Sequence, residues 1–235
     1  MSERLKKIAG NWETLARYDP LWSILTDPSK TGNRWSEKEF FATGEREVAQ
    51  LIDYLQSLSL KTSGERALDF GCGVGRVTQP LSKFFRTVMG VDASPTMIEL
   101  ARKYNSFPDH VIYQLSCETR LPFPDDFFDL VYSRLVLQHI DTELALQYVS
   151  EFIRTVKHEG VVVFQAPSKC ITTDGHHFES PINTSYGTVT IDMNVLPIDS
   201  VLETVSKANA FVIDIHHDLD AGSSFESRTY CISKH

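Results

Sequence analysis

From Arg66 onward, short apolar runs rich in β-branched residues alternate with segments whose apolar residues recur at helical spacing. The short runs are apolar at consecutive positions, which is typical of strands buried on both faces of a parallel sheet. Alternation of such strands with helices indicates βαβ units, so the pattern predicts an α/β fold. The expected strands are 66–70, 87–92, 111–115, 128–133, 160–166, 211–216 and 229–233.

Some of the expected helices have marked ends. Ser94 precedes Pro95, which is the arrangement of an N-cap followed by proline at the first helical position. Ser200 and Glu203 have the spacing of a capping box, and Asn209 is suited to a left-handed stop. The expected helices are 95–104, 142–157, 201–208 and a short one after Gly75 that begins late, because Pro80 fits only its first turn.

Three further segments complete the organisation. Residues 37–60 have helical periodicity and are expected to pack on the sheet as one amphipathic helix. Residues 1–36 hold all three tryptophans and two Asp-Pro turns, which favours an irregular arm that covers the fold. Residues 167–196 are polar and longer than the usual connection, so they are expected to form a substrate-side insertion. We therefore expect a single domain over 1–235 with this arm and this insertion.

Composition and charge limit the function classes. The chain has 235 residues, of which 42% are hydrophobic, and no apolar run reaches the length of a membrane helix. The first residues lack the apolar stretch of a secretory signal, so the cytoplasm is the expected location. The net charge is −8 without a Lys/Arg cluster, which disfavours nucleic acid and favours a small or neutral partner.

The cysteines and the paired histidines predict no metal site. Cys72, Cys117, Cys170 and Cys231 are far apart and never form a CxxC pair, so reduced, buried thiols are expected. His216-His217 has no carboxylate or cysteine at ligand spacing and is expected to be polar surface.

The most informative segment is a predicted strand that runs into a glycine-rich turn before a helix. Glycines at 71, 73 and 75 allow the backbone to turn tightly and to approach a ligand that a side chain would exclude. A dinucleotide fingerprint would need glycine at position 76, where Arg76 stands, and the phosphate loop GxxxxGK[ST] is absent. The turn alone also fits a purely structural role.

A carboxylate ends the next predicted strand. Asp92 lies 23 positions after Asp69, where an acidic side chain at a strand tip can accept both hydroxyls of a ribose. This spacing favours a nucleoside-containing ligand. The alternative is that Asp92 only precedes the helix that begins at Pro95.

Together these residues resemble the class I S-adenosylmethionine-dependent methyltransferases over about 37–233. The family has a Rossmann-like, seven-stranded, mostly parallel sheet with an antiparallel C-terminal hairpin and helices on both faces, and the resemblance implies this fold here. The segments 121–123, Leu-Pro-Phe, and 128–131, Phe-Asp-Leu-Val, match landmarks of the family before and on its fourth strand.

The resemblance also implies a cofactor site. It assigns the methionine part to the loop with Asp69, the ribose to Asp92, the adenine to the residues after the third strand, and the methionine end to the end of the fourth strand. Residues at the entry of the first long helix resemble a lid, to which we add Tyr18 of the arm. The implied cofactor contacts are Asp69, Gly71, Cys72, Gly73, Gly75, Asp92, Ala93, Cys117, Glu118 and Ser133, beside which Arg134 lies, and the implied lid contacts are Phe41, Thr43 and Gly44.

The chain departs from the family pattern at two places. Leu115-Ser116 stands where the family often has Gly-Asp before the adenine contacts. The usual Leu-Lys-Pro-Gly-Gly turn before the fifth strand is replaced over 156–160, which is a structural position.

S-adenosylmethionine is an activated methyl donor, so the resemblance implies catalysis that rests on placement of the acceptor. A base is needed only for an acceptor that does not arrive ionised. No base is assigned; His139 is the first candidate, and Tyr18, His176 and His177 are others. Aromatic residues of the arm and insertion favour a small organic acceptor, with S-adenosylhomocysteine as the second product. Two alternatives stay open: a non-catalytic cofactor-binding scaffold, and an NAD-dependent oxidoreductase.

Overall fold

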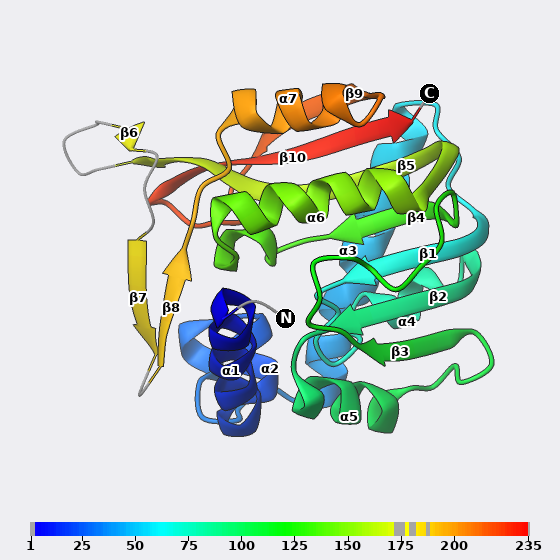
Figure 1. The fold of residues 1–235 in the computed structure, drawn as a ribbon. Helices are drawn as coiled ribbons and strands as arrows, with labels where there is room; N and C mark the ends of the chain where they lie inside the picture. The colour runs from blue at the N-terminus through cyan, green and yellow to red at the C-terminus, as the bar shows by residue number, and fades with distance from the viewer. Residues whose placement is uncertain (1–2, 172–176, 179–181, 187–188, 235) are drawn as a thin grey trace. The chain divides into compact units, whose positions relative to one another are not determined.

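The computed structural model of the chain describes residues 3–171, 177–178, 182–186 and 189–234. Its contacts group into two compact units, residues 2–117 and residues 118–235, whose elements are labelled in Figure 1. The division into a single domain with an arm and an insertion stays a prediction. In the described ranges, no helix combines the length and the apolar character that a membrane span needs.

The N-terminal unit contains three parallel strands, β1 (Gly64–Phe70), β2 (Phe85–Asp92) and β3 (Val111–Leu115). β2 pairs with both of the others, and its last residue, Asp92, is the register partner of Leu115. The strands predicted at these places are confirmed, and β1 and β2 each begin two residues earlier than expected. Their buried β-branched and aliphatic positions explain why the sequence pattern was sufficient.

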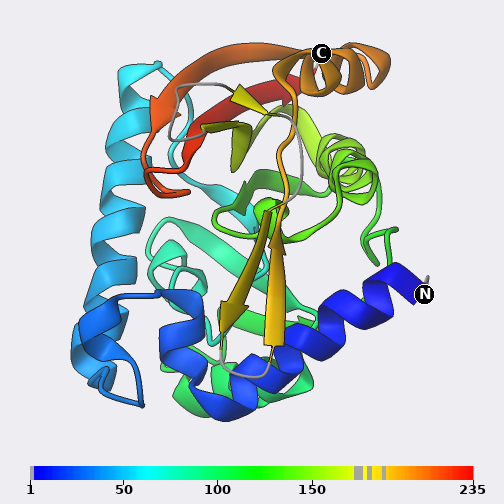
Figure 2. The ribbon, with the colours of Figure 1, turned by 90° about the vertical axis from the view of Figure 1, so that its left-hand side faces the viewer.

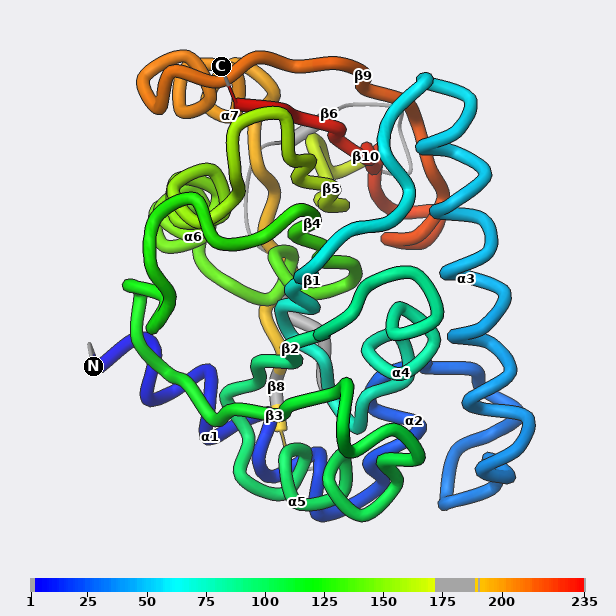
Figure 3. Tube along the Cα trace, turned by 90° about the vertical axis from the view of Figure 1, so that its right-hand side faces the viewer, coloured from blue at the N-terminus to red at the C-terminus, as the bar shows by residue number. Residues whose placement is uncertain are grey.

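Three helices follow the predicted pattern in this unit: α3 (Glu37–Ser57), α4 (Thr78–Leu81) and α5 (Pro95–Tyr104). Ser94 Oγ accepts a hydrogen bond from Met97 N at 3.1 Å, which confirms the N-cap. α4 begins late and carries Pro80 in its first turn, as expected. α3 and α4 lie on the same side of β1 and β2 (Figure 3).

The prediction that 1–36 is irregular is wrong. The segment forms α1 (Glu3–Tyr18), α2 (Pro20–Ile24) and a short 3-10 helix, η1 (Pro28–Lys30). Leu5, Leu15 and Ala16 are buried on one face of α1, so its apolar positions do follow a helical period. The Asp-Pro pairs start helices: Asp19 accepts from Trp22 N and Asp27 from Ser29 N, each with proline following.

The C-terminal unit contains the remaining strands of the sheet. β4 (Phe128–Ser133) runs parallel to β5 (Val156–Ile171), and β10 (Phe225–Lys234) runs antiparallel to both β5 and β9 (Ala210–Asp218). The strand order is β3-β2-β1-β4-β5-β10-β9. A mostly parallel, seven-stranded sheet with an antiparallel C-terminal hairpin is therefore confirmed.

Helices of this unit are η2 (Leu137–His139), α6 (Thr142–Thr155) and α7 (Ile198–Lys207). The capping box at Ser200 is wrong, because α7 begins at Ile198 after Pro197 and has no side-chain cap. The restricted φ of proline places the helix start two residues before Ser200. Asn209 has a φ of 55°, so the left-handed stop is confirmed.

The segment expected as a polar insertion is more regular than predicted. β5 continues to Ile171 and pairs with β6 (His177–Phe178), and β7 (Ile182–Tyr186) pairs with β8 (Val189–Met193). Figure 2 shows β7 and β8 as two adjacent antiparallel arrows. Val189, Ile191 and Met193 are buried at period two, which is the strand signal that the polar composition hid. The substrate-side role of 167–196 stays a prediction.

Candidate cofactor site

The glycine-rich turn after β1 has the backbone that its sequence requires. Gly71, Gly73 and Gly75 have φ values of 74°, 51° and 85°, a region that residues with a Cβ rarely enter. Gly71 N and Cys72 N both donate to Val91 O, at 2.8 and 3.0 Å, so the turn is held against β2. The backbone of this loop is therefore held in a fixed conformation, and its contact with a ligand stays a prediction.

Tyr113 of β3 lies beneath the turn. A Cβ built on Gly75 would lie 2.0 Å from Tyr113 Oη, and one on Gly90 would lie 2.8 Å from the Tyr113 ring. The Tyr113 hydroxyl is buried without a hydrogen-bond partner among the described residues, and this burial raises its pKa. Glycine at 75 is thus required by close packing as well as by its φ.

Asp69, the acidic residue before the loop, is buried at the end of β1. Its burial raises the pKa of the carboxyl to about 7, against the opposing effect of a 2.6 Å hydrogen bond that Thr78 Oγ1 donates. Asp69 therefore connects the end of β1 to the first residue of α4. Its predicted contact with the methionine part of the cofactor stays a prediction.

Asp92 joins the glycine turn to the next helix. Its Oδ2 accepts from Gly73 N at 2.9 Å, and its Oδ1 accepts from Ser94 N at 2.8 Å. Burial raises the pKa of Asp92, and the hydrogen bonds from the backbone oppose that shift. The carboxylate at the end of β2 therefore lies against the glycine turn, and its predicted contact with a ribose stays a prediction.

Of the residues assigned to the adenine, Cys117 ends the N-terminal unit. Cys117 Sγ donates to Ala93 O at 3.2 Å, so the end of β3 lies beside the residue after Asp92. Glu118 is the next residue in the chain and begins the C-terminal unit, where its carbonyl accepts from Tyr148 Oη at 3.1 Å.

Glu13 of α1 lies beside the candidate site, and sequence reasoning missed it. Its carboxylate accepts from Ser94 Oγ at 2.7 Å, from Thr96 N at 3.1 Å and from Thr96 Oγ1 at 2.7 Å. Burial acts to raise its pKa, but the hydrogen bonds from Ser94 and Thr96 lower it to about 2. A carboxylate from the arm is thus fixed at the start of α5, two residues beyond Asp92. The helical period of α1 could have indicated the helix, but it carries no signal of this contact with α5.

The arm also contacts the glycine turn directly. A Cβ on Gly73 would lie 2.5 Å from Ile24 Cδ1, so this side chain covers Gly73. Further apolar side chains of the arm, α3, the turn and α5 form one core cluster. Its buried members are Ala16, Leu21, Phe40, Val74 and Met97.

The predicted lid residues contact the segment between the turn and α4. Thr43 Oγ1 accepts from Arg76 Nη1 at 3.3 Å, and a Cβ on Gly44 would lie 1.9 Å from Arg76 O. The ring of Phe41 packs edge-on against Phe40 and Tyr104. Tyr18 is 69% exposed at the end of α1. Their role as a lid stays a prediction.

Arg76 stands where a dinucleotide fingerprint would have glycine. Its Nη2 donates to Glu47 Oε2 at 2.7 Å, in an ion pair whose two side chains are only 6% and 7% exposed. A buried charge pair of this kind is costly to break, because one partner would remain buried and uncompensated. Arg76, which departs from the dinucleotide pattern, therefore forms a buried ion pair with Glu47 of α3.

Ser133 and His139 belong to the C-terminal unit. Ser133 is buried at the end of β4, and its Oγ has no hydrogen-bond partner among the described residues. His139 Nδ1 lies 3.2 Å from Asp192 O, and its Nε2 lies 3.2 Å from the Gln138 amide nitrogen. Burial lowers the pKa of His139 to about 4, so the ring is neutral, with Nδ1 as donor and Nε2 as acceptor. This arrangement ties η2 to β8 and assigns no base.

Two of the other base candidates cannot be placed in the described part of the chain. His176 lies outside the described residues, as does the side chain of His177. Within the described ranges, no group of three or more His, Cys, Asp and Glu side chains is arranged to hold a metal ion.

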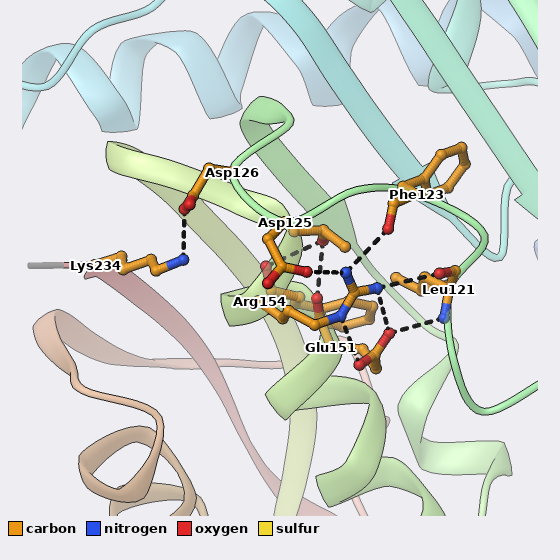
Figure 4. Close-up of polar contacts among 9 residues, drawn as sticks. Leu121, Phe123, Asp125, Asp126, Glu151, Arg154 and Lys234 are labelled. Carbon is orange, nitrogen blue, oxygen red and sulfur yellow. Dashed lines mark hydrogen bonds and ion pairs between the residues drawn. The ribbon is translucent and has the colours of Figure 1, made fainter.

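The Leu-Pro-Phe landmark is held by α6. Arg154 donates to Phe123 O at 2.9 Å and to Leu121 O at 3.1 Å, while Glu151 accepts from Leu121 N at 2.8 Å (Figure 4). Asp125 adds an ion pair with Arg154 at 2.6 Å. The landmark therefore marks a segment whose backbone is fixed by two charged side chains, between Glu118 and β4.

Comparison with known proteins gives consistent results. Residues 68–164 match a family model described as a methyltransferase domain. An uncharacterized methyltransferase of Bacillus subtilis is 30% identical over 134 residues, which is 56% of this chain and 50% of that protein. The chain thus spans about half the length of this curated relative.

Solved structures agree on the fold. Magnesium protoporphyrin IX methyltransferase from Synechocystis, solved with bound S-adenosylmethionine, has a TM-score of 0.65 at 13% identity and covers 100% of this chain and 99% of its own. A structure described as a [4+2]-cyclase has a TM-score of 0.59 at 15% identity, over 79% of this chain and 80% of its own. The same fold therefore carries more than one chemistry.

Proposed function

Because the chain carries a methyltransferase domain of the class I S-adenosylmethionine-dependent family, we propose that it transfers a methyl group from S-adenosylmethionine to a small organic acceptor. The observation that carries this proposal is the link between the glycine turn and Asp92, whose carboxylate accepts from Gly73 N at 2.9 Å. The link joins a side-chain-free backbone surface to the acidic group expected to bind a ribose.

The residues of the N-terminal unit fit this cofactor. Asp92 is partly exposed, and its two oxygens accept from Gly73 N and Ser94 N, so the carboxylate keeps acceptor capacity for ribose hydroxyls. The left-handed glycines at 71, 73 and 75 provide main chain for the methionine part. Ala93 and Cys117 lie together beside Asp92, where the resemblance assigns the adenine.

S-adenosylmethionine supplies a methyl group on a sulfonium, which is already a good leaving group. The chain's own residues then have to orient the cofactor and hold the acceptor, and proximity supplies much of the rate acceleration. Asp92 and the glycine turn orient the ribose and the methionine part. Since both ring nitrogens of His139 are engaged, we assign no general base and favour an acceptor whose nucleophilic atom needs none.

We expect the acceptor to be a small molecule and the protein to work in the cytoplasm. The net charge of −8 opposes association with the phosphate backbone of a nucleic acid.

The test is a calorimetric titration of the folded protein with S-adenosylmethionine, S-adenosylhomocysteine and NAD, followed by assays of S-adenosylhomocysteine release with a panel of acceptors. We expect both sulfur ligands to bind, NAD not to bind, and at least one acceptor to be turned over. Absence of S-adenosylmethionine binding at millimolar concentration would overturn the proposal. Binding of NAD alone would support the oxidoreductase.

The non-catalytic scaffold remains the second candidate, and the absence of an assigned base favours it. Cofactor binding without S-adenosylhomocysteine release from any acceptor in the panel would support the scaffold. Turnover of one acceptor would exclude it.

A further inference from the structure

The first residue after β4 is an arginine whose guanidinium holds a carboxylate. Arg134 Nε donates to Asp220 Oδ2 at 2.6 Å, and Arg134 Nη2 lies 2.5 Å from Asp220 Oδ1. Two parallel bonds to the two oxygens of one carboxylate form the fork that guanidinium groups use to recognise planar anions. The two side chains are 27% and 22% exposed, so a solute can reach this pair.

The backbone next to Arg134 is held in a costly conformation. Leu135 has a φ of 62°, which is rare for a residue with a large side chain. Its N–H donates to Gln165 Oε1 at 3.1 Å, and the Gln165 amide donates in turn to Ser227 Oγ at 2.6 Å. Gln165 is 1% exposed, so a buried polar network maintains this turn.

Stability alone does not explain the arrangement. A partly exposed ion pair contributes little to folding, whereas left-handed backbone at leucine is unfavourable. Strained backbone maintained by surrounding hydrogen bonds is a feature of ligand-binding positions. In open α/β sheets, ligands bind outside the carboxyl ends of the strands, which is where β4 delivers Arg134.

The position of Asp220 would allow another carboxylate to displace it from Arg134. It lies in the turn between β9 and β10, beside Leu219, which is 90% exposed. Its backbone N–H donates to Asp218 Oδ1, so the turn has its own hydrogen bonds and does not depend on Arg134 alone.

We propose that Arg134 binds a carboxylate of the methyl acceptor, and that Asp220 occupies this position when no acceptor is bound. This inference rests on the proposed function and specifies its substrate as a small organic acid. The carboxylate anchors the acceptor, and Asp220 competes with it for the same guanidinium fork.

The test uses acetate, benzoate and octanoate as probes, each beside its primary amide, and phenyl phosphate as a second anion. Binding to the full chain is measured by calorimetry with and without S-adenosylhomocysteine. At least one acid should bind saturably, and its amide should bind about tenfold more weakly or not at all. Binding of phenyl phosphate without any of the acids would overturn the carboxylate assignment.

Two variants change the affinity in opposite directions. Arg134→Gln should lower the affinity for the acid about tenfold or more, because the guanidinium fork is lost. Asp220→Asn should raise the affinity for the acid several-fold, because the competing carboxylate is removed. If the pair only ties the β9–β10 turn to β4, neither variant changes acid binding and both lower the melting temperature.

Lys157→Gln is the matched control, since Lys157 and Asp129 form a pair of similar exposure at 2.8 Å. It should leave the affinity for the acid unchanged. If no acid binds to the wild type or to Asp220→Asn while S-adenosylhomocysteine still binds, this inference fails and the proposed function stands. If S-adenosylhomocysteine does not bind to the folded protein, the proposed function fails as well.

Discussion

Asp92 Oδ2 and Gly73 N are 19 residues apart in sequence and 2.9 Å apart in the structure. The bond fixes the middle of the glycine turn to the carboxylate at the end of β2. Loss of the Asp92 carboxylate is therefore expected to change both the ribose contact and the position of the turn.

Asp92→Asn should weaken S-adenosylmethionine binding by about 1.5–3 kcal/mol, the range for hydrogen bonds that involve a charged group. The amide keeps the shape and one acceptor oxygen, so the overall fold should be preserved. Its NH2 group must face one of the two backbone N–H donors, so a local shift of the glycine turn adds to the loss of affinity. Calorimetry checks the affinity, and circular dichroism checks the fold. Asp53→Asn, on the exposed side of α3, is the control and should bind normally. Unchanged affinity in a folded Asp92→Asn protein would refute the ribose assignment.

Gly75→Ala should destabilise the fold by about 2 kcal/mol or more, because it combines left-handed backbone with a clash. The new Cβ would lie 2.0 Å from Tyr113 Oη. Gly32 has a similar φ of 79° with nothing within 4 Å, so Gly32→Ala isolates the cost of the backbone. Urea unfolding of both variants measures the difference. Equal costs at the two positions would show that the contact with Tyr113 is not energetically important.

Tyr113→Phe should stabilise the protein by about 1 kcal/mol, because it removes a buried hydroxyl that has no partner. The same change should recover part of the stability lost in Gly75→Ala, since Oη is the nearest atom to the new Cβ. A thermodynamic cycle over the two single variants and the double variant tests this coupling. A loss of stability in Tyr113→Phe alone would indicate a partner that the structure does not show.

Glu13→Gln should destabilise the protein by about 2 kcal/mol at neutral pH, because the hydrogen bonds to Ser94 and Thr96 favour the ionised carboxylate. The pKa of Glu13 is lowered from 4.5 to about 2 in the folded state. Its contribution is therefore present above pH 4.5 and is lost as the pH falls through 2. The difference between wild type and variant should shrink over that window in urea titrations.

Glu45→Gln provides the control for this pH dependence, because Glu45 pairs with Lys83 at the surface, where both side chains are more than half exposed. Its difference from wild type should be small at every pH. A Glu13→Gln difference that persists unchanged at low pH would contradict the assignment.

Much of the fold could be predicted because its signals are local. The buried apolar runs defined β1 to β5, and Ser94 with Pro95 defined the start of α5, since a cap and a fixed φ act within a few residues. The glycine turn and Asp92 were found in the same way, because left-handed backbone restricts which residues can stand there.

Other features depend on partners far away in the chain. Neither Glu13 nor Arg76 has a local signal of its role, because each is defined by a hydrogen-bonded partner more than 25 residues away. The helices of the arm and the strands within 167–196 were missed because polar and aromatic composition outweighed a real period in their buried positions.

The sequence by itself thus determined strands β1 to β5, β9 and β10, the glycine turn and its carboxylate, because backbone sterics and burial act on neighbouring residues. Only the tertiary structure decided that Glu13 accepts hydrogen bonds at the start of α5, that Tyr113 lies beneath Gly75, and that Arg134 forms an ion pair with Asp220. Such pairings depend on which distant side chains meet once the apolar surfaces are buried, and short-range pattern carries no information about that outcome.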